Sequence, residues 1–176
     1  VAYTLLMQET YPSWLYPVKM GATTIWERWD GIKPDSTFQT AGMNSFNHYA
    51  YGAIGDWMYR VVAGLDTEEE KPGYKKTTIK PHTGGKLTHA AASLNTYYGK
   101  LGSAWKLENE KLILDIEIPA NTTATIYIPA ANAAAITENG LILTSSKDIQ
   151  LVGIDKGYAQ VTVGSGSYRF EVANSK

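Results

Sequence analysis

The sequence predicts an α+β protein in which a short helical region precedes an antiparallel β-sandwich of jelly-roll type. Residues 45–65 carry apolar side chains at every third or fourth position, which is the period of an amphipathic helix. Beyond residue 76, short stretches rich in β-branched and aromatic residues alternate with Gly, Pro and Asn turns. Short strands repeated between turns are typical of a sandwich of two packed sheets.

The predicted helix has candidate caps at both ends. Asn44 or Ser45 can cap its start, because both side chains accept hydrogen bonds from free helix N–H groups. Gly64 can help to end it, since glycine adopts the left-handed conformation that follows many helices. Gly52 and Gly55 lie inside it, where each glycine costs up to about 1 kcal/mol. They predict that a neighbouring element packs very closely there.

The charged segment 66–76 contains Pro72 and Gly73 and is expected to be a solvated connection. We therefore predict two domains, residues 1–70 and 71–176. The first offers two or three helices, too few to bury its aromatic side chains without a packing partner. Missing sequence, the sandwich or a second copy of the chain are the candidate partners.

The first residues, VAYTLLMQ, contain no initiator Met and lack the layout of a signal peptide. They look like the end of a helix already under way. We therefore expect the chain to be the C-terminal part of a longer protein, with a processed mature N-terminus as the alternative.

Seven segments are expected to form or contain strands, and the third and fourth alternate clearly between apolar and polar residues. They are residues 77–82, 86–107, 111–119, 122–129, 148–155, 158–166 and 167–173. The alanine-rich stretch 130–135 is too short to predict a helix.

Composition excludes several classes of function. The net charge of −1 gives no electrostatic footprint for nucleic acid or an anionic membrane, and no apolar run reaches the length of a membrane span. The absence of cysteine excludes disulfides and thiolate metal sites. His48, His82 and His89 lack metal-ligand spacing, and the last two are expected at the surface. We expect no metal, no other cofactor, no nucleic acid and no membrane partner.

The strongest chemical signal is TTIWERWDG, in which Glu27 lies between Trp26 and Trp29. Indole faces pack on the C–H surfaces of sugar rings, and a carboxylate beside them can have its pKa tuned for acid–base work. His48 follows in NSFNHYAYG and can hydrogen-bond sugar hydroxyls. These residues predict a carbohydrate site centred on Glu27. Residue types alone leave this glutamate open as general base, nucleophile or structural carboxylate.

The neighbouring residues refine this prediction. If the segment is extended, Glu27 and Trp29 share one face, which would suit a sugar cleft. Arg28 is expected to pair with Asp30 or Asp56. The candidate second carboxylates are Asp30, Asp35 and Asp56. No G-x-S-x-G elbow, phosphate-binding loop or dinucleotide fingerprint is present.

The sandwich offers a second, non-enzymatic interpretation. Tyr97, Tyr98 and Trp105 could form the aromatic platform of a carbohydrate-binding module. We favour the alternative that they belong to the sandwich core and to a seam between domains.

Two motifs carry a family resemblance. YPSWLYPVKMGATTIWERWDG and GMNSFNHYAYGAIGDWMYRVVAGL strongly resemble the last part of the catalytic domain of bacterial α-L-rhamnosidases, glycoside hydrolase family 78. The stretch from PGYKK to SAWKL resembles the C-terminal β-sandwich of these enzymes. The resemblance implies that residues 1–70 are the incomplete end of an (α/α)6 barrel and that hydrolysis inverts the anomeric carbon.

The resemblance also implies residue roles. The glutamate of the WERWD motif, here Glu27, is the general base in that family, and the histidine of FNHYAYG, here His48, contacts rhamnose. Trp26 and Trp29 would line or support the pocket. The general acid of the family lies in an earlier block of the barrel that this sequence lacks. We therefore expect the isolated chain to be inactive.

The expected partners are a rhamnose-containing glycoside or polysaccharide and the missing N-terminal part of the same protein. A periplasmic or extracellular location suits such a parent enzyme, although the sequence itself predicts no compartment. Two alternatives remain open, namely a non-catalytic supporting or carbohydrate-binding sandwich and a different (α/α)6-barrel glycosidase.

Overall fold

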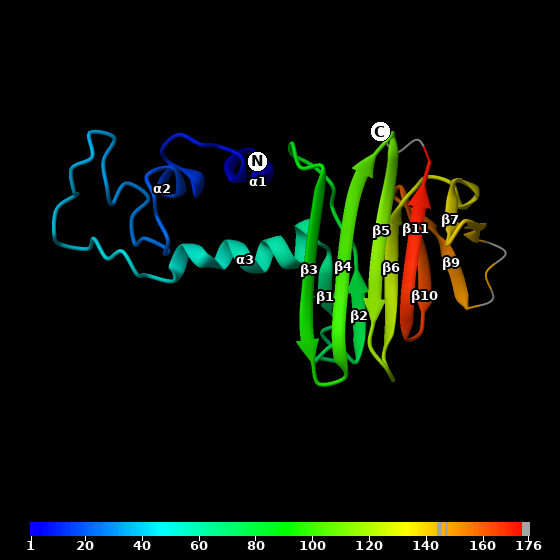
Figure 1. Cartoon of the computed structure of the whole chain (residues 1–176). Helices are drawn as coiled ribbons and strands as arrows, with labels where there is room; N and C mark the ends of the chain where they lie inside the picture. The colour runs from blue at the N-terminus through cyan, green and yellow to red at the C-terminus, as the bar shows by residue number, and fades with distance from the viewer. Residues whose placement is uncertain (144–145, 147, 174–176) are drawn as a thin grey trace. The chain divides into compact units, whose positions relative to one another are not determined.

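A computed structural model of the chain describes residues 1–143, 146 and 148–173. The chain folds into two compact units (Figure 1). The first unit comprises Val1–Trp57 with Gly84–Lys86, and the second comprises Met58–Thr83 with Leu87–Lys176. The domains expected from the sequence, 1–70 and 71–176, stay a prediction.

The first unit consists of short helices and long irregular segments. Its helices are α1, Ala2–Leu6, α2, Leu15–Lys19, the 3-10 turn η1, Ala50–Ala53, and α3, Ile54–Trp57. The Tyr3 ring of α1 meets the Trp57 ring edge to face, 5.1 Å between centroids. It also packs on Gly84 and Gly85, where an added Cβ would lie 2.9 Å from the ring. Glycine at these two positions therefore allows α1 to approach.

The helix predicted from the apolar period is shorter than expected at its start. Helical structure begins with η1 and runs through α3 into a π-helical turn, η2, Met58–Val62. The predicted caps Asn44 and Ser45 were wrong, because the segment around Ser45 pairs with the segment around Glu27 instead. The Ser45 carbonyl accepts from the Glu27 amide and not from an amide one turn further along the chain, so it does not open a helix.

Glycine was predicted to end the helix at Gly64 and to allow close packing at Gly52 and Gly55, and only the first prediction is correct. Gly64 follows the last turn with φ +74°, as predicted, and lies so close to Pro81 that an added Cβ would be 2.1 Å from its nitrogen. The close packing predicted at the other two glycines was wrong. A Cβ on Gly52 would make an ordinary 3.6 Å contact with Ile25, and one on Gly55 would meet nothing within 4 Å.

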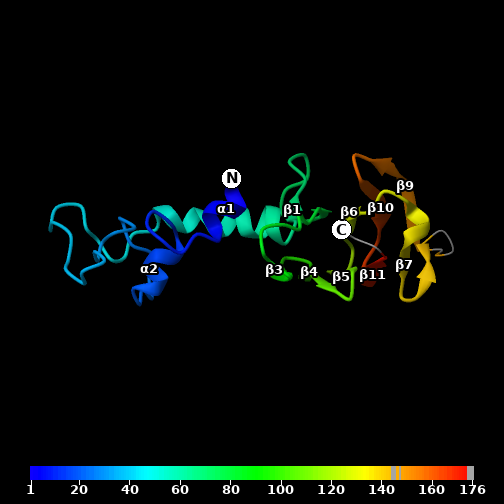
Figure 2. The same ribbon diagram turned by 90° about the horizontal axis from the view of Figure 1, so that it is seen from above.

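The second unit is a sandwich of two sheets, which Figure 2 shows as two layers. The five-stranded sheet has the order β1 (Leu65–Thr67), β2 (Lys76–Ile79), β6 (Thr123–Pro129), β10 (Tyr158–Val163) and β9 (Ile149–Asp155). The six-stranded sheet has the order β3 (His89–Thr96), β4 (Gly99–Glu108), β5 (Lys111–Ile118), β11 (Gly166–Val172), β7 (Ile136–Glu138) and β8 (Leu141–Ile142). A 3-10 turn, η3, Ala133–Ala135, precedes β7. Among the described pairs, β2 with β6 is parallel and the others are antiparallel.

The predicted α+β content and the predicted sandwich are confirmed. All seven expected segments contain strands, and the segment 86–107 forms the hairpin β3–β4. The strands β1, β7 and β8 were not predicted, because segments of two or three residues are too short to show alternation. The charged connection predicted for 66–76 joins β1 to β2, and residues 69–73 in it are exposed.

The core lies between the two sheets. Leu112, Leu114, Ile116 and Ile118 of β5 are buried, and Ile113 between them is also buried. Each such side chain contributes roughly 1.5–3 kcal/mol on burial. Two side chains of β4 also satisfy carbonyls at the end of η2, since Trp105 Nε1 donates to Val62 and Ser103 Oγ donates to Ala63, both at 2.7 Å. These bonds complete a helix end whose carbonyls lack intrahelical partners.

Gly64→Ala should destabilise the second unit. Alanine would hold a left-handed φ and place its Cβ against the Pro81 backbone, so we expect a loss of at least about 2 kcal/mol in the free energy of unfolding. Urea unfolding followed by tryptophan fluorescence measures this loss. Gly153→Ala is the control, because its Cβ would meet nothing within 4 Å. Equal unfolding midpoints for the two variants would contradict the close approach.

Candidate functional site

Two segments that are far apart in the sequence lie side by side in the first unit: residues 24–27 and residues 45–48. The Glu27 amide donates to the Ser45 carbonyl, and the His48 amide donates to the Ile25 carbonyl, both at 2.8 Å. The pairing is antiparallel. It therefore brings the motif around Glu27 next to the motif around His48.

Ser45 holds both the backbone and the side chain of Glu27. The Ser45 carbonyl accepts the hydrogen bond from the Glu27 amide, and the Ser45 amide donates a second hydrogen bond to Glu27 Oε2 at 2.8 Å. Arg28 pairs with Asp30, one of its two predicted partners, at 3.4 Å from Nε to Oδ1. The Glu27 side chain is half-buried, and its Oε1 has no hydrogen-bond partner among the described residues. The carboxylate is therefore oriented and still open to water or a ligand.

His48 immediately precedes the helical run. Its ring lies parallel to the Tyr49 ring, 5.8 Å between centroids, and its Nδ1 accepts a weak hydrogen bond from the Ala50 amide at 3.4 Å. A neutral imidazole that accepts at Nδ1 carries its proton on Nε2. The half-buried His48 can therefore offer an N–H donor to a ligand.

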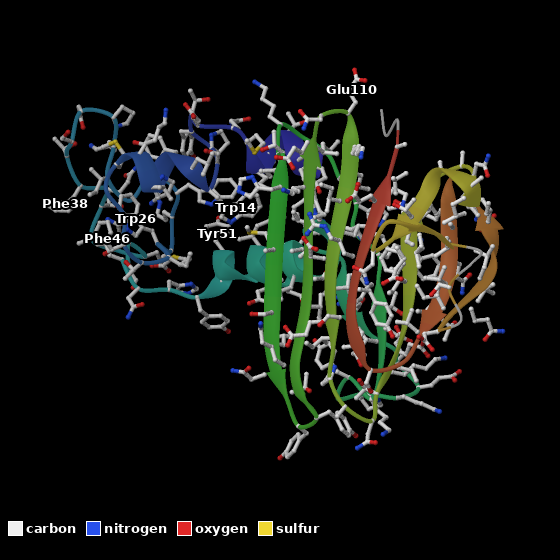
Figure 3. All side chains as sticks on the ribbon, turned by 45° about the vertical axis from the view of Figure 1, so that its right-hand side comes forward. Trp14, Trp26, Phe38, Phe46, Tyr51 and Glu110 are labelled. Atoms are coloured by element: carbon white, nitrogen blue, oxygen red, sulfur yellow. The ribbon has the colours of Figure 1, made fainter. Side chains whose placement is uncertain are left out.

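Trp26 is a supporting residue of this loop. Its side chain is 5% exposed, and its ring meets Phe46 edge to face at 5.1 Å. Phe38 packs on the other side of the contact, 5.7 Å from Phe46, and Figure 3 shows the three rings gathered together. The indole is almost fully buried, and it also lines a small pocket together with Trp14, Trp29 and Tyr51.

Trp29 belongs to a second aromatic group. Its ring stacks on Tyr51 with centroids 4.6 Å apart and 24° between planes, and it meets Trp14 edge to face at 5.6 Å. Trp14 Nε1 donates to the Tyr51 carbonyl at 2.9 Å, and Figure 3 shows these two residues close together. Trp29 Nε1 is buried without an acceptor among the described residues. Buried donors are normally paired, so an acceptor from outside those residues is expected here.

The segment at Glu27 is not extended, so the condition under which Glu27 and Trp29 would share a face is not met. The chain turns directly after this residue, and the Gly31 amide donates to the Arg28 carbonyl at 3.2 Å. Sequence analysis also missed the contacts of Trp14 and Tyr51 with the site. Their places within the YPSW and HYAYG motifs were the only signal for them.

Two of the candidate second carboxylates have structural roles. Asp30 accepts a hydrogen bond from Gln39 Nε2 at 2.7 Å. Asp35 accepts from the hydroxyl and the amide of Thr37 at 2.6 and 3.0 Å, and these bonds lower the pKa of its carboxyl. Asp56, the third candidate, lies in the first turn of α3.

The described residues hold no group of three or more metal-ligating side chains, and they include no helix long and apolar enough to cross a membrane. His82 and His89 are exposed, as predicted. The Nδ1 atom of His82 lies 3.3 Å from the Tyr158 hydroxyl, and the neighbouring atoms that keep part of the water from this otherwise exposed ring, together with the charge of Lys80, lower the His82 pKa.

The aromatic platform considered for the sandwich does not form. Tyr97 is fully exposed, Tyr98 lies under the Lys75 ammonium at 4.9 Å, and Trp105 is in the core. Trp105 thus has the predicted core position, whereas Tyr97 lies outside the core and the predicted seam between domains stays a prediction.

A shallow groove crosses the outer face of β3, β4, β5 and β11. Its lining includes the small residues Ala91, Gly102 and Ala104. The ion pairs Lys100–Glu117 and Asp115–Arg169, both at 2.8 Å, also line it. These charges already satisfy one another, so the groove gives little support to a binding module.

Gly31→Ala should disturb the loop that carries Glu27. An added Cβ would lie 3.0 Å from Asn44 Oδ1, 3.1 Å from Phe46 Cε1 and 3.3 Å from Trp26 Cε3. Overpacking costs typically about 1–3 kcal/mol, so the thermal unfolding midpoint should fall. Gly42→Ala, whose Cβ would meet nothing within 4 Å, should leave it unchanged. The packing described above would be refuted by a Gly31→Ala protein as stable as this control.

Two family models match consecutive parts of the chain. The bacterial alpha-L-rhamnosidase 6 hairpin glycosidase domain matches residues 1–62, and the bacterial alpha-L-rhamnosidase C-terminal domain matches residues 64–142. Alpha-L-rhamnosidases from Formosa agariphila and Streptomyces avermitilis are each 42% identical to the chain over 98% of its length. The chain spans 18% and 16% of these two relatives.

Solved structures agree with these matches. The crystal structure of Streptomyces avermitilis alpha-L-rhamnosidase complexed with L-rhamnose has a TM-score of 0.85 and 42% identity, covering 97% of this chain and 16% of that one. Alpha-L-rhamnosidase from Dictyoglumus thermophilum has a TM-score of 0.83 and 34% identity, covering 98% of this chain and 18% of that one. With both domain types matched in order, the chain belongs to the bacterial α-L-rhamnosidase family.

Proposed function

We propose that this chain carries the general base of an inverting glycoside hydrolase that cleaves terminal α-L-rhamnose from glycosides or polysaccharides. The observation that carries the proposal is the Glu27 carboxylate, which the Ser45 amide orients through one oxygen while the other stays open. Family membership supports the substrate class, because the relatives are named alpha-L-rhamnosidases and one was crystallised with L-rhamnose.

In this reaction a water molecule attacks the anomeric carbon on the face opposite the leaving group. Glu27 accepts a proton from that water. A second carboxyl group, roughly 6.5–9.5 Å away, donates a proton to the glycosidic oxygen as its bond to the anomeric carbon breaks. The products are rhamnose of inverted configuration and the free alcohol, so no covalent intermediate with the enzyme forms.

We assign the second carboxyl group to another part of the intact enzyme. Asp30 and Asp35 are already engaged by hydrogen bonds within the loop. The chain spans only 18% and 16% of two relatives, so most of such an enzyme lies outside it. The remaining sequence of the same protein would then supply the carboxyl group that protonates the leaving oxygen.

The other site residues have supporting roles in the proposal. His48 donates from Nε2 to a hydroxyl of the sugar. Trp29 borders the sugar through the part of its ring that Trp14 and Tyr51 leave uncovered, because the ring is only half-buried. Trp26 supports the loop from its buried position.

Glu27→Gln in the intact enzyme should lower kcat for an aryl α-L-rhamnoside by about 10²- to 10⁴-fold, because the amide cannot accept the proton of water. The amide oxygen can still accept the Ser45 hydrogen bond, so the fold should persist by circular dichroism. Azide should restore turnover of Glu27→Ala, since an anionic nucleophile needs no base. The product is then the β-rhamnosyl azide.

Glu69→Gln is the matched control for this substitution. Glu69 is exposed in the loop between β1 and β2, so its variant should keep wild-type kcat. Wild-type turnover by Glu27→Gln, or equal losses in both variants, would reject the general-base role.

The chain alone should show no measurable hydrolysis of the same aryl rhamnoside, because the proton donor for the leaving oxygen is missing. The assay follows release of nitrophenol from purified chain, with the intact enzyme as the positive control. Turnover at rates ordinary for enzymes, about 1–10³ s⁻¹, would mean that a residue of this chain supplies the acid.

A further inference from the structure

The Glu27 carboxylate needs more support than its own hydrogen bonds provide. Glu27 lies in an irregular segment, so no helix or strand ladder fixes its backbone. Its anchors are the two hydrogen bonds that it exchanges with Ser45, and the chain turns directly afterwards. The direction of the carboxylate therefore depends on what holds the turn.

A stacked pair of rings holds this turn. Trp29, two residues after Glu27, lies face to face with Tyr51, three residues after His48, with the centroids 4.6 Å apart. The stack therefore joins the same two motifs that the backbone pairing joins, but on the far side of the turn. Offset stacking at this distance is a favoured arrangement for aromatic rings.

Trp14, which lies at the start of α2, contacts the stack from a third segment of the chain. Its ring meets Trp29 edge to face at 5.6 Å, while its Nε1 donates to the Tyr51 carbonyl at 2.9 Å. One side chain thus contacts both members of the stack. This arrangement opposes sliding of Tyr51 along the Trp29 ring.

We propose that Tyr51 and Trp14 are positioning residues, which fix through Trp29 the turn that aims the Glu27 carboxylate. The inference rests on the proposed function of Glu27 and requires no contact of either residue with the sugar. A displacement of about 1 Å in a reacting group can lower a rate by about 10²-fold. Loss of the stack should therefore lower kcat far more than it changes KM.

The test uses the intact enzyme. Tyr51→Leu should lower kcat by about tenfold to a hundredfold with KM within about twofold, whereas Tyr51→Phe should keep wild-type kcat because the ring face makes the contact. Trp14→Phe removes the donor to the Tyr51 carbonyl and should give a smaller loss. It serves as the second variant if Tyr51→Leu does not fold. Tyr168→Leu, which removes a tyrosine stacked on Phe170 in the sandwich, is the matched control and should retain kcat.

A double-mutant cycle with Glu27→Gln separates positioning from a general structural role. If Tyr51 acts through Glu27, Tyr51→Leu should cause no further loss of kcat once the glutamate is gone. Independent losses that multiply in the double variant would overturn the inference while leaving the general base intact. Full activity of Glu27→Gln itself would overturn the proposed function, so the two failures are distinguishable.

Discussion

The candidate site depends on the reciprocal hydrogen bonds between Glu27 and Ser45. These bonds join two motifs that a loop separates in the sequence, and they orient a carboxylate that lies in no regular element. The same pairing opposes an earlier start of the helical run, since the Ser45 carbonyl accepts from Glu27 and not from an amide one turn further along the chain. This one pairing therefore influences both the direction of the carboxylate and the start of the helix.

The helix prediction failed at its start for a non-local reason. The apolar period of residues 45–65 is genuine, and the run from Ala50 to Val62 follows it. Residues 45–48 share the period, but their backbone is engaged by residues 24–27. A window of neighbouring residues contains no information about such a distant partner, so tertiary pairing overrides the local preference.

The sandwich was predictable because its signals are local. Alternation within a strand and turn residues at its ends both lie inside a short window, and β5 shows both. The burial of Tyr97 and Trp105 shows what these local signals cannot predict. Tyr97 lies in the turn between β3 and β4 and is exposed, whereas Trp105 occupies an inward position of β4. Aromatic character was visible in the sequence, but the register that separates the two residues was not.

The identities of the site residues came from motifs, but their geometry did not. Trp29 would share a face with Glu27 only in an extended segment, whereas the chain turns here and Trp29 stacks on Tyr51 from the other motif. Such a contact joins a residue within a turn to a residue of η1 in another segment, and the shape of the turn depends on packing. Strand periodicity therefore could not describe it, and both motifs had to be placed in space first.

The packing of the first unit and the proposed chemistry impose the same requirement. Phe38, Met43 and Tyr49 are 69%, 78% and 88% exposed, which is unusual for large apolar side chains in a completed core. An inverting hydrolysis also needs a second carboxyl group across the sugar from Glu27. In a family whose members are several times longer than this chain, further sequence can meet both needs at once. Under the proposed function, sequence outside this chain would supply both the cover for these side chains and the acid.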